Sequence, residues 1–268
     1  MNEIKQSCNI DVRGIATVTL NNGDRHNAFD DKMIEELSDI FRALGEDATV
    51  RVVVLEAEGK SFSAGADLAW MKRMSGYSRE ENYADAEKLA EMLHLLYSLD
   101  KPTIARVQGA AFGGGVGLVS CCDIAIASLR ASFSFSEVKL GLVPATISPY
   151  VIAAIGPHAA RRYFSTAERF DAETALRLGL VSEVVEEQAL DERIETIATC
   201  ILANGPKAVA IAKQLVADVQ YQSIDANLRR RTSELIANVR SSEEGREGLG
   251  AFLEKRHPAW ILAGRTGA

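Results

Sequence analysis

Strand-like and helix-like segments alternate through the first half of the chain, and no other sequence feature restricts the fold as strongly. Runs rich in β-branched residues at 15–20, 51–57 and 103–107 are bounded by turn residues or a proline, as strands are. Between them, apolar residues recur at helical spacing in 30–44 and 84–99. Strands that alternate with helices are typical of crossover units and at least partly parallel sheets. The sequence therefore predicts an α/β fold.

The last third of the chain has helical spacing almost throughout and is interrupted by Gly205-Pro206. We therefore expect an α/β core at 1–204 and a helical region at 205–268. A helical tail of this kind covers the core or mediates oligomerisation, and the simpler alternative is that it packs on itself. Helices are predicted at 189–202, 207–221, 224–239 and 243–255.

Composition and charge exclude several classes of protein. Of the 268 residues, 47% are apolar and 25% are charged, which is too apolar for a disordered chain. A net charge of -7 argues against non-specific nucleic-acid binding, which usually needs a basic face. The N-terminus has no secretory signal, and the charge-free stretches 107–122 and 140–160 are broken by glycine or proline. We expect a soluble cytoplasmic protein that does not enter a membrane.

Cysteine and histidine spacing gives no indication of a metal site. The four cysteines, two of them adjacent at Cys121 and Cys122, fit neither a zinc site nor a disulfide framework, so we expect reduced thiols in the core. The four histidines show no ligand spacing either. His94 lies on an apolar helix and is expected to be a packed core residue. No metal and no redox cofactor are predicted.

Two glycine-rich loops are the first candidate for a functional site. SFSAGADL at 61–68 follows the strand 51–57, and QGAAFGGGVGL at 108–118 follows the strand 103–107. Glycine allows a close approach of backbone to ligand, and a helix N-terminus offers unpaired N–H donors. Two such loops that converge would stabilise a developing oxyanion. Neither loop has a phosphate-loop or dinucleotide-binding spacing. Each loop alone is equally well explained by a tight turn or close packing.

A single glutamate is the second candidate. Glu137 lies in the otherwise apolar segment FSFSEVKLGLVP. A partly buried carboxyl has a raised pKa and exchanges protons near neutral pH. The alternative is a surface glutamate that is paired with Lys139 or Arg161.

Taken together, these segments resemble the crotonase, or enoyl-CoA hydratase/isomerase, superfamily. The matching segments also include HNAF at 26–29, KPTIARVQGAAFGGGVGLVSCCDIAIAS and ETALRLGLVSEVV, in the order of the family and over nearly the whole chain. The resemblance implies a spiral of ββα units, a C-terminal helical trimerisation region and an acyl-CoA thioester substrate, whose coenzyme A is part of the substrate. It also implies a homotrimer or a dimer of trimers.

The resemblance assigns roles to individual residues. Ala66 and Gly114 match the positions whose N–H groups hold the thioester oxygen, and Glu137 matches a catalytic glutamate. Phe252 and Lys255 resemble residues that reach the coenzyme A of a neighbouring subunit. Arg25 and Lys255 are equally consistent with solvated charges. The remaining substrate-binding positions implied by the resemblance are Arg25, Ala64, Gly65, Asp67, Leu68, Gly113 and Gly117.

One departure from the family pattern bears on the substrate. Hydratases with two glutamates carry the other glutamate three residues after the oxyanion-hole glycine, where this chain has Gly117. Longer segments, such as SEVKLGLVPATISPYV, resemble bacterial methylglutaconyl-CoA and isohexenylglutaconyl-CoA hydratases, which act in leucine and terpene breakdown. Their substrates are branched at C3 and carry a carboxylate. We expect Gly117 to leave room for that branch, so that Gly117→Glu would favour a linear substrate.

The predicted function is therefore hydration of a C3-branched, carboxylated enoyl-CoA, with Glu137 as the acid and base. The first alternative is an enoyl-CoA isomerase or another enolate-forming reaction on the same scaffold, because related isomerases have one glutamate. The second alternative is a non-catalytic protein that binds RNA or acyl-CoA.

Overall fold

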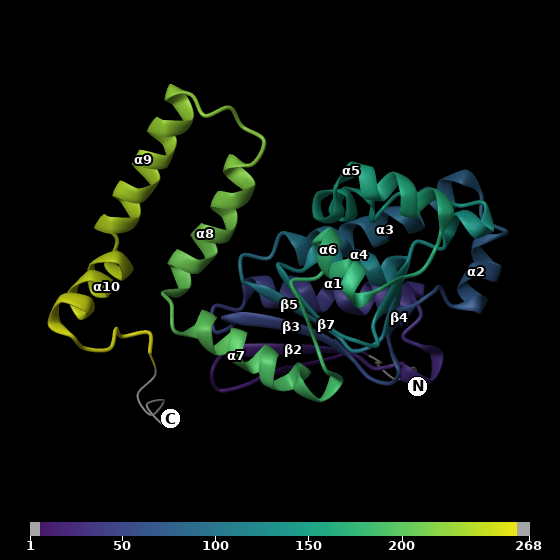
Figure 1. The fold of residues 1–268 in the computed structure, drawn as a ribbon, viewed down its shortest axis with the longest axis horizontal. Coiled ribbons are helices and arrows are strands. Elements are labelled where there is room, and N and C mark those ends of the chain that lie inside the picture. Colours follow the sequence, from purple (N-terminus) through teal and green to yellow (C-terminus); the bar gives the residue numbers. More distant parts are fainter. Residues whose placement is uncertain (1–5, 262–268) are drawn as a thin grey trace.

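Parallel pairing builds the larger of two sheets in this computed structural model, which describes residues 6–261 (Figure 1). All its strands run parallel to their neighbours except the first, which pairs antiparallel at one edge. The α/β prediction is confirmed. Residues 1–5, part of the N-terminal stretch, and 262–268, the end of the predicted helical region, lie outside the described residues. The strand order is β1 (Gln6–Ile10), β2 (Ile15–Leu20), β3 (Val52–Ala57), β5 (Thr103–Val107), β7 (Ile124–Ser128), β10 (Glu183–Val185).

A second, smaller sheet is made of short strands that the sequence analysis took for loops. Ser61–Ala64 and Ala110–Phe112, at the start of the two glycine-rich loops, are strands. Each follows a strand of the larger sheet, so successive ββ pairs place one strand in each sheet, as expected for the ββα spiral. The order of the second sheet is β4 (Ser61–Ala64), β6 (Ala110–Phe112), β8 (Ser132–Ser134), β9 (Phe170–Asp171).

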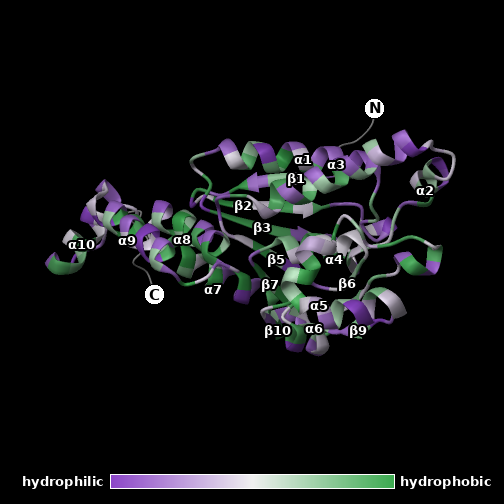
Figure 2. Cartoon of the chain, turned by 90° about the horizontal axis from the view of Figure 1, so that it is seen from above, coloured by the Kyte–Doolittle hydropathy of each residue, from purple (hydrophilic) through white to green (hydrophobic). Residues whose placement is uncertain are grey.

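Side-chain alternation along the central strands fills two cores. In β3, Val53 and Leu55 face the main core, while Val52 and Val54 face a smaller one under α7. Because a parallel sheet is buried on both faces, its strands are continuously apolar, and Figure 2 colours β3 as hydrophobic. The helices before the C-terminal region are α1 (Asp31–Glu46), α2 (Leu68–Met74), α3 (Arg79–Tyr97), α4 (Gly114–Cys121), α5 (Ser148–Thr166), α6 (Ala172–Leu178) and α7 (Leu190–Leu202), with short 3-10 turns η1 (Gly23–Arg25), η2 (Glu137–Leu140) and η3 (Glu187–Ala189).

Side-chain caps fix the starts of two helices, and α3 begins before the predicted residue 84. The carboxylate of Asp30 caps α1 by accepting a 2.7 Å hydrogen bond from the N–H of Met33. Ser78 begins α3 with a full capping box that includes Glu81. These caps fix where the helices start.

The C-terminal helices stand apart from the α/β core in Figure 1. The first begins at Pro206, next to the predicted boundary at 205, although the division into domains stays a prediction. Few of their residues are buried: Leu228 and Ala251 are the ones in the described part of these helices. The helices are α8 (Pro206–Val219), α9 (Ala226–Ser241) and α10 (Glu243–Glu254).

Two expectations about single residues are wrong. His94 is exposed on α3 because it lies on the face that turns away from buried Met92, Leu93 and Leu96. Of the four cysteines, which are all free thiols, Cys8 and Cys200 are exposed, so only Cys121 and Cys122 belong to the interior. Within residues 6–261, no helix is long and apolar enough to cross a bilayer.

Candidate active site

Three candidate groups follow three neighbouring strands of the second sheet. Ala66 comes two residues after β4, Gly114 two after β6, and Glu137 three after β8. These strands are parallel and adjacent. Their carboxyl ends therefore meet at one edge of the sheet, where ligands of α/β folds bind. The predicted oxyanion donors and the predicted acid–base residue are brought to the same edge.

The N–H groups of Ala66 and Gly114 are free to bind a ligand. Neither group donates a hydrogen bond to any other described residue, although the loop around them is well bonded. Both residues are partly exposed. Gly114 is the first residue of α4, so its N–H has no partner within the helix and lies at the positive end of the helix dipole. The two donors suit a negatively charged oxygen.

Phe29 connects the two donors. Its N–H bonds to the carbonyl of Gly65 at 3.1 Å, and its carbonyl accepts from the N–H of Asp67 at 2.7 Å, so its backbone brackets Ala66. Its buried ring lies against Gly114, where an added Cβ would be 3.0 Å from a ring carbon. One side chain and its own backbone thus hold both loops in register.

Glu137 is half-buried and lacks a partner for one of its oxygens. Its Oε2 is buried without a hydrogen bond, and no ion pair in the described chain joins it to Lys139 or Arg161. The surface-glutamate alternative is therefore rejected. Burial raises the pKa of the Glu137 carboxyl, and a hydrogen bond from backbone opposes this rise. An unpartnered carboxylate oxygen is a ready site for a water or a substrate proton.

Aromatic packing fixes the segment that carries Glu137. Phe133 and Phe135 are fully buried; the first stacks on Phe170 at 5.6 Å between ring centroids, and the second meets Phe164 edge-on at 4.9 Å. After the glutamate, the turn η2 ends at Gly141, whose φ of 72° favours glycine. The rings thus anchor the strand before Glu137, whereas the apolar residues after it are largely exposed, among them Leu140, Leu142 and Val143.

Gly113 links the second glycine-rich loop to the glutamate. Its N–H bonds to the carbonyl of Ser134 at 2.9 Å, and its φ of 54° with ψ of -119° is open only to glycine. A Cβ added here would lie 3.2 Å from Oε1 of Glu137. Gly113 therefore borders the carboxylate, and any side chain at this position would press on it.

The space expected at Gly117 is absent. Gly117 is buried, and a Cβ added to it would overlap Cγ2 of Ile147 and lie 3.4 Å from Cδ2 of Leu93. The prediction that Gly117 leaves room for a substrate branch is wrong, because Ile147 fills that room. Gly117→Glu alone would meet Ile147 before it could alter substrate choice.

The predicted residues of the first loop lie together beside Ala66. Arg25 is not simply a solvated charge, since it donates a 2.9 Å hydrogen bond to the carboxylate of Asp67. Asp67 also caps α2. Burial alone would raise the pKa of Asp67, but hydrogen bonds from Trp70, Arg25 and Ala69 lower it. Around this pair, Ala64 and Gly65 are half-buried, Gly65 faces open space, and Leu68 is exposed.

Phe252 and Lys255 lie far from this edge within one chain. Both are exposed at the end of α10, while α2 lies at the opposite end of the molecule in both views (Figures 1 and 2). The structure therefore brings together all the predicted site residues of the core, and leaves these two apart.

Two residues at this edge were missed as site residues. Phe29 was recognised only as part of HNAF, and Ile147 only as part of a longer segment. Periodicity gives no signal for either, because both simply look like buried apolar residues. Phe29 is 3% exposed and Ile147 is 2% exposed.

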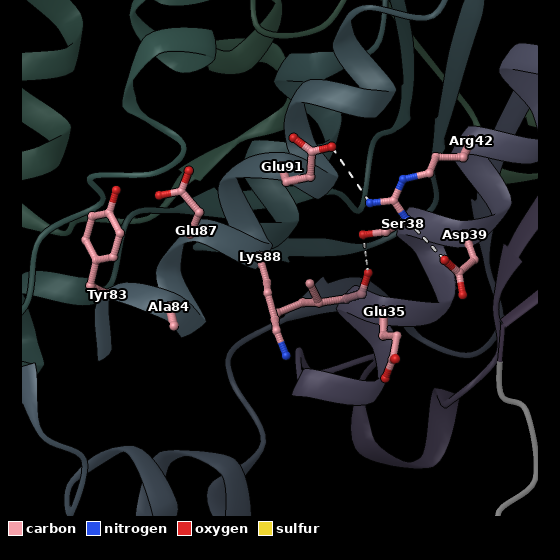
Figure 3. A pocket seen from close by; sticks show the side chains of 10 residues that line it. Glu35, Ser38, Asp39, Arg42, Tyr83, Ala84, Glu87, Lys88 and Glu91 are labelled. Carbon is pink, nitrogen blue, oxygen red and sulfur yellow. Dashed lines mark hydrogen bonds and ion pairs between the residues drawn. The ribbon is translucent and has the colours of Figure 1, made fainter. Parts of the chain in front are cut away.

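A separate groove of about 560 Å³ runs between α1 and α3 (Figure 3). Arg42 joins its walls through Asp39 on its own helix at 3.1 Å and Glu91 on α3 at 3.8 Å. It contains none of the candidate residues. Within the described chain, no group of three or more His, Cys, Asp or Glu side chains is placed to hold a metal ion. The prediction that no metal or redox cofactor is needed stays a prediction.

The comparisons with known proteins agree with this geometry. A family model described as enoyl-CoA hydratase/isomerase matches residues 11–262. The chain belongs to the enoyl-CoA hydratase/isomerase family. The family predicted from the sequence motifs, and the crotonase fold that goes with it, are thus confirmed.

Relatives of this family match nearly the whole chain. A short-chain-enoyl-CoA hydratase of Clostridium acetobutylicum is 35% identical over 90% of this chain and 92% of its own. A crotonyl-CoA hydratase of Syntrophomonas wolfei is 32% identical over 92% and 94%. The crystal structure of an enoyl-CoA hydratase from Shewanella pealeana superposes with a TM-score of 0.92 at 47% identity, covering 96% of each chain.

Proposed function

We propose that the protein is an enoyl-CoA hydratase, a hydro-lyase that adds water across the double bond of an enoyl thioester. The observation that carries this proposal is the unpartnered oxygen of Glu137 beside the loops that present the free N–H groups of Ala66 and Gly114. Family membership and the hydratase names of its relatives support it.

The mechanism begins with the thioester carbonyl, whose oxygen accepts hydrogen bonds from Ala66 and Gly114. These donors polarise the conjugated enoyl system and stabilise the enolate that forms when water adds. Loss of one donor of this kind typically costs about 2.7–4 kcal/mol. The positive end of the α4 dipole favours the same negative charge.

Glu137 acts first as the general base and then as the general acid. Its carboxylate removes a proton from water as the oxygen attacks C3, and the resulting carboxylic acid returns a proton to C2. A raised pKa suits both steps, because the group is a stronger base when ionised and still gives up its proton. One carboxylate is sufficient for this cycle if it faces both carbons.

We further propose a substrate that is branched at C3 and carries a distal carboxylate, such as 3-methylglutaconyl-CoA or isohexenylglutaconyl-CoA. Support comes from the missing second carboxylate at Gly117: the substrate supplies its own acidic group, and a like charge from the protein would repel it. An apolar residue, Ile147, lies where that carboxylate would be.

A panel of enoyl-CoA thioesters with and without a distal carboxylate tests both proposals by mass spectrometry. Hydration appears as a product that gains one water. The second candidate function, double-bond isomerisation, is favoured by the single carboxylate and gives a product of unchanged mass. Absence of any water gain across the panel would refute the hydratase proposal.

We also propose that the protein assembles as a trimer or a dimer of trimers. The C-terminal helices expose apolar side chains, and Figure 2 shows hydrophobic residues on α8 and α10. Phe252 and Lys255 lie at the end of α10, which stands at the opposite end of the molecule from α2, so in this assembly they would serve a neighbour's site. Light scattering measures the assembly directly. The exposed residues include Val216, Ile236, Leu249, Phe252 and Leu253.

We propose a cytoplasmic location, where the four cysteines, all free thiols in the structure, would stay reduced. Fractionation of cells with an antibody to the protein tests it.

A further inference from the structure

Gly117 and Ile147 form a reciprocal pair of small and large residues. A Cβ on Gly117 would overlap Cγ2 of Ile147 and lie 3.1 Å from its Cβ. Leu93, which is fully buried, closes the same space from α3. Ile147 cannot easily move aside, because it is buried at the start of α5. The volume in front of Gly117 is therefore already full.

This pair lies beside the catalytic glutamate. Gly113 and Gly117 are one helical turn apart, joined by the 3.2 Å hydrogen bond from the N–H of Gly117 to the carbonyl of Gly113. Gly113, the N-cap of α4, borders Glu137, and Gly117, in the first turn of the helix, meets Ile147. Glu137 and Ile147 therefore lie near the same end of α4.

We propose that Ile147 is a specificity-determining residue that restricts this active site to one carboxylate. Its side chain fills, with apolar surface, the position beside Glu137 from which α4 would otherwise present a second acid. The inference rests on the proposed hydratase function. It predicts that a second carboxylate can enter at position 117 only when Ile147 is removed.

The test uses wild type and four variants: Gly117→Glu, Ile147→Gly, the double variant Gly117→Glu/Ile147→Gly, and the matched control Gly117→Gln/Ile147→Gly. Glycine replaces Ile147 because even its Cβ would be 3.1 Å from the new side chain. The readouts are the thermal midpoint of each protein and kcat/KM for crotonyl-CoA, which is linear and uncharged.

We expect Gly117→Glu to lower the thermal midpoint strongly and the added Ile147→Gly to recover part of that loss. The double variant with glutamate should hydrate crotonyl-CoA on the order of 10²-fold faster than the glutamine control, because only glutamate exchanges a proton. Ile147→Gly alone should show no such gain.

Two results would overturn the proposal. One is a Gly117→Glu protein as stable as wild type, which would mean that Ile147 does not block the position. The other is equal activity of the glutamate and glutamine double variants, which would mean that the position does not reach the reacting carbons. Failure of the proposed hydratase function would be seen in a different measurement. In that case the wild-type protein would hydrate no enoyl-CoA in the panel, and the thermal midpoints of the variants would still show whether Ile147 blocks position 117.

Discussion

Phe29 touches both amide donors, so its size sets how far apart they lie. The ring packs on Gly114 while the backbone brackets Ala66, and neither contact involves the substrate. We therefore regard Phe29 as a positioning residue. Backbone donors have no side chain of their own to adjust, so a packed neighbour is the means by which the sequence places them.

Phe29→Leu should lower kcat with little change in KM, because the donors would hold the ground-state oxygen but fit the enolate less well. Misplacement of this kind costs up to about 10²-fold. The matched control is Phe41→Leu, another buried phenylalanine on α1, which should lose stability without loss of kcat. Equal kcat losses in the two variants would reduce the Phe29 effect to general destabilisation.

Glu137→Gln should retain the fold and acyl-CoA binding but lower kcat by about 10²–10⁴-fold, since glutamine has nearly the same shape and cannot carry the proton. Steady-state kinetics with a ligand-binding control measures this. Retention of most of the wild-type kcat would place the acid–base residue elsewhere.

The same variant should alter stability in a pH-dependent way. Because burial raises the pKa of Glu137, its contribution to stability is fully present below the ordinary glutamate pKa and is lost as pH rises through the folded-state value. Glu137→Gln removes that loss, so its thermal midpoint should rise relative to wild type as the pH approaches neutrality. A constant difference at every pH would contradict the burial argument.

At the scale of the element, α4 can lie where it does only because it begins with small residues. A Cβ on Gly115 would overlap the carbonyl oxygen of Ser63 and lie 3.0 Å from its Cβ, so the helix packs directly on the backbone of β4. This contact places Gly114 beside the loop that holds Ala66. Glycine in a helix is unfavourable in itself, and close packing is the reason for it here.

Gly115→Ala should destabilise the protein by about 1–3 kcal/mol through overpacking. Gly45→Ala in α1 is the matched control: its added Cβ would be 3.7 Å from the nearest atom, an ordinary contact, so helix propensity alone should make it neutral or stabilising. Chemical denaturation of the two variants compares them. Similar stability would show that α4 has room to move.

Long periodic elements were predictable from sequence, and short ones were not. The strands 15–20 and 103–107 agree with the structure because a β-branched run bounded by turn residues or a proline is a local signal. The strands β4 and β6 were missed because a run of only three or four residues is too short to show a period. The contact of Gly117 with Ile147 was missed for another reason: it joins residues that are distant in sequence, and no local pattern records it.

At the scale of the whole molecule, the exposed apolar side chains on α8–α10 are the surface that the proposed trimer would cover. Phe252 is 80% exposed and Leu253 is 78% exposed, which is costly in an isolated chain. Lys255, which is proposed to serve the site of a neighbouring chain, lies in the same region. Because the same helix would then contribute to both, we expect assembly and substrate binding to be coupled.

Leu253→Asp should reduce the mass measured by light scattering and, on dilution, weaken acyl-CoA binding. A charge buried in an interface without a partner is strongly unfavourable. Asn227→Asp, an exposed position at the start of α9 where a negative charge is favourable, is the control and should leave the assembly intact. An unchanged mass for Leu253→Asp would show that this face stays exposed.

The candidate site combines backbone groups with one side chain, and mutations affect these two kinds of group differently. The groups proposed to hold the thioester oxygen are main-chain N–H groups at Ala66 and Gly114, and every amino acid except proline has such a group. The proposed proton chemistry, in contrast, depends on one side chain, that of Glu137, and on what the residues at positions 117 and 147 allow. Mutations at positions 117, 137 and 147 can therefore change which proton transfers follow enolate formation. The backbone N–H groups that stabilise the enolate would be kept.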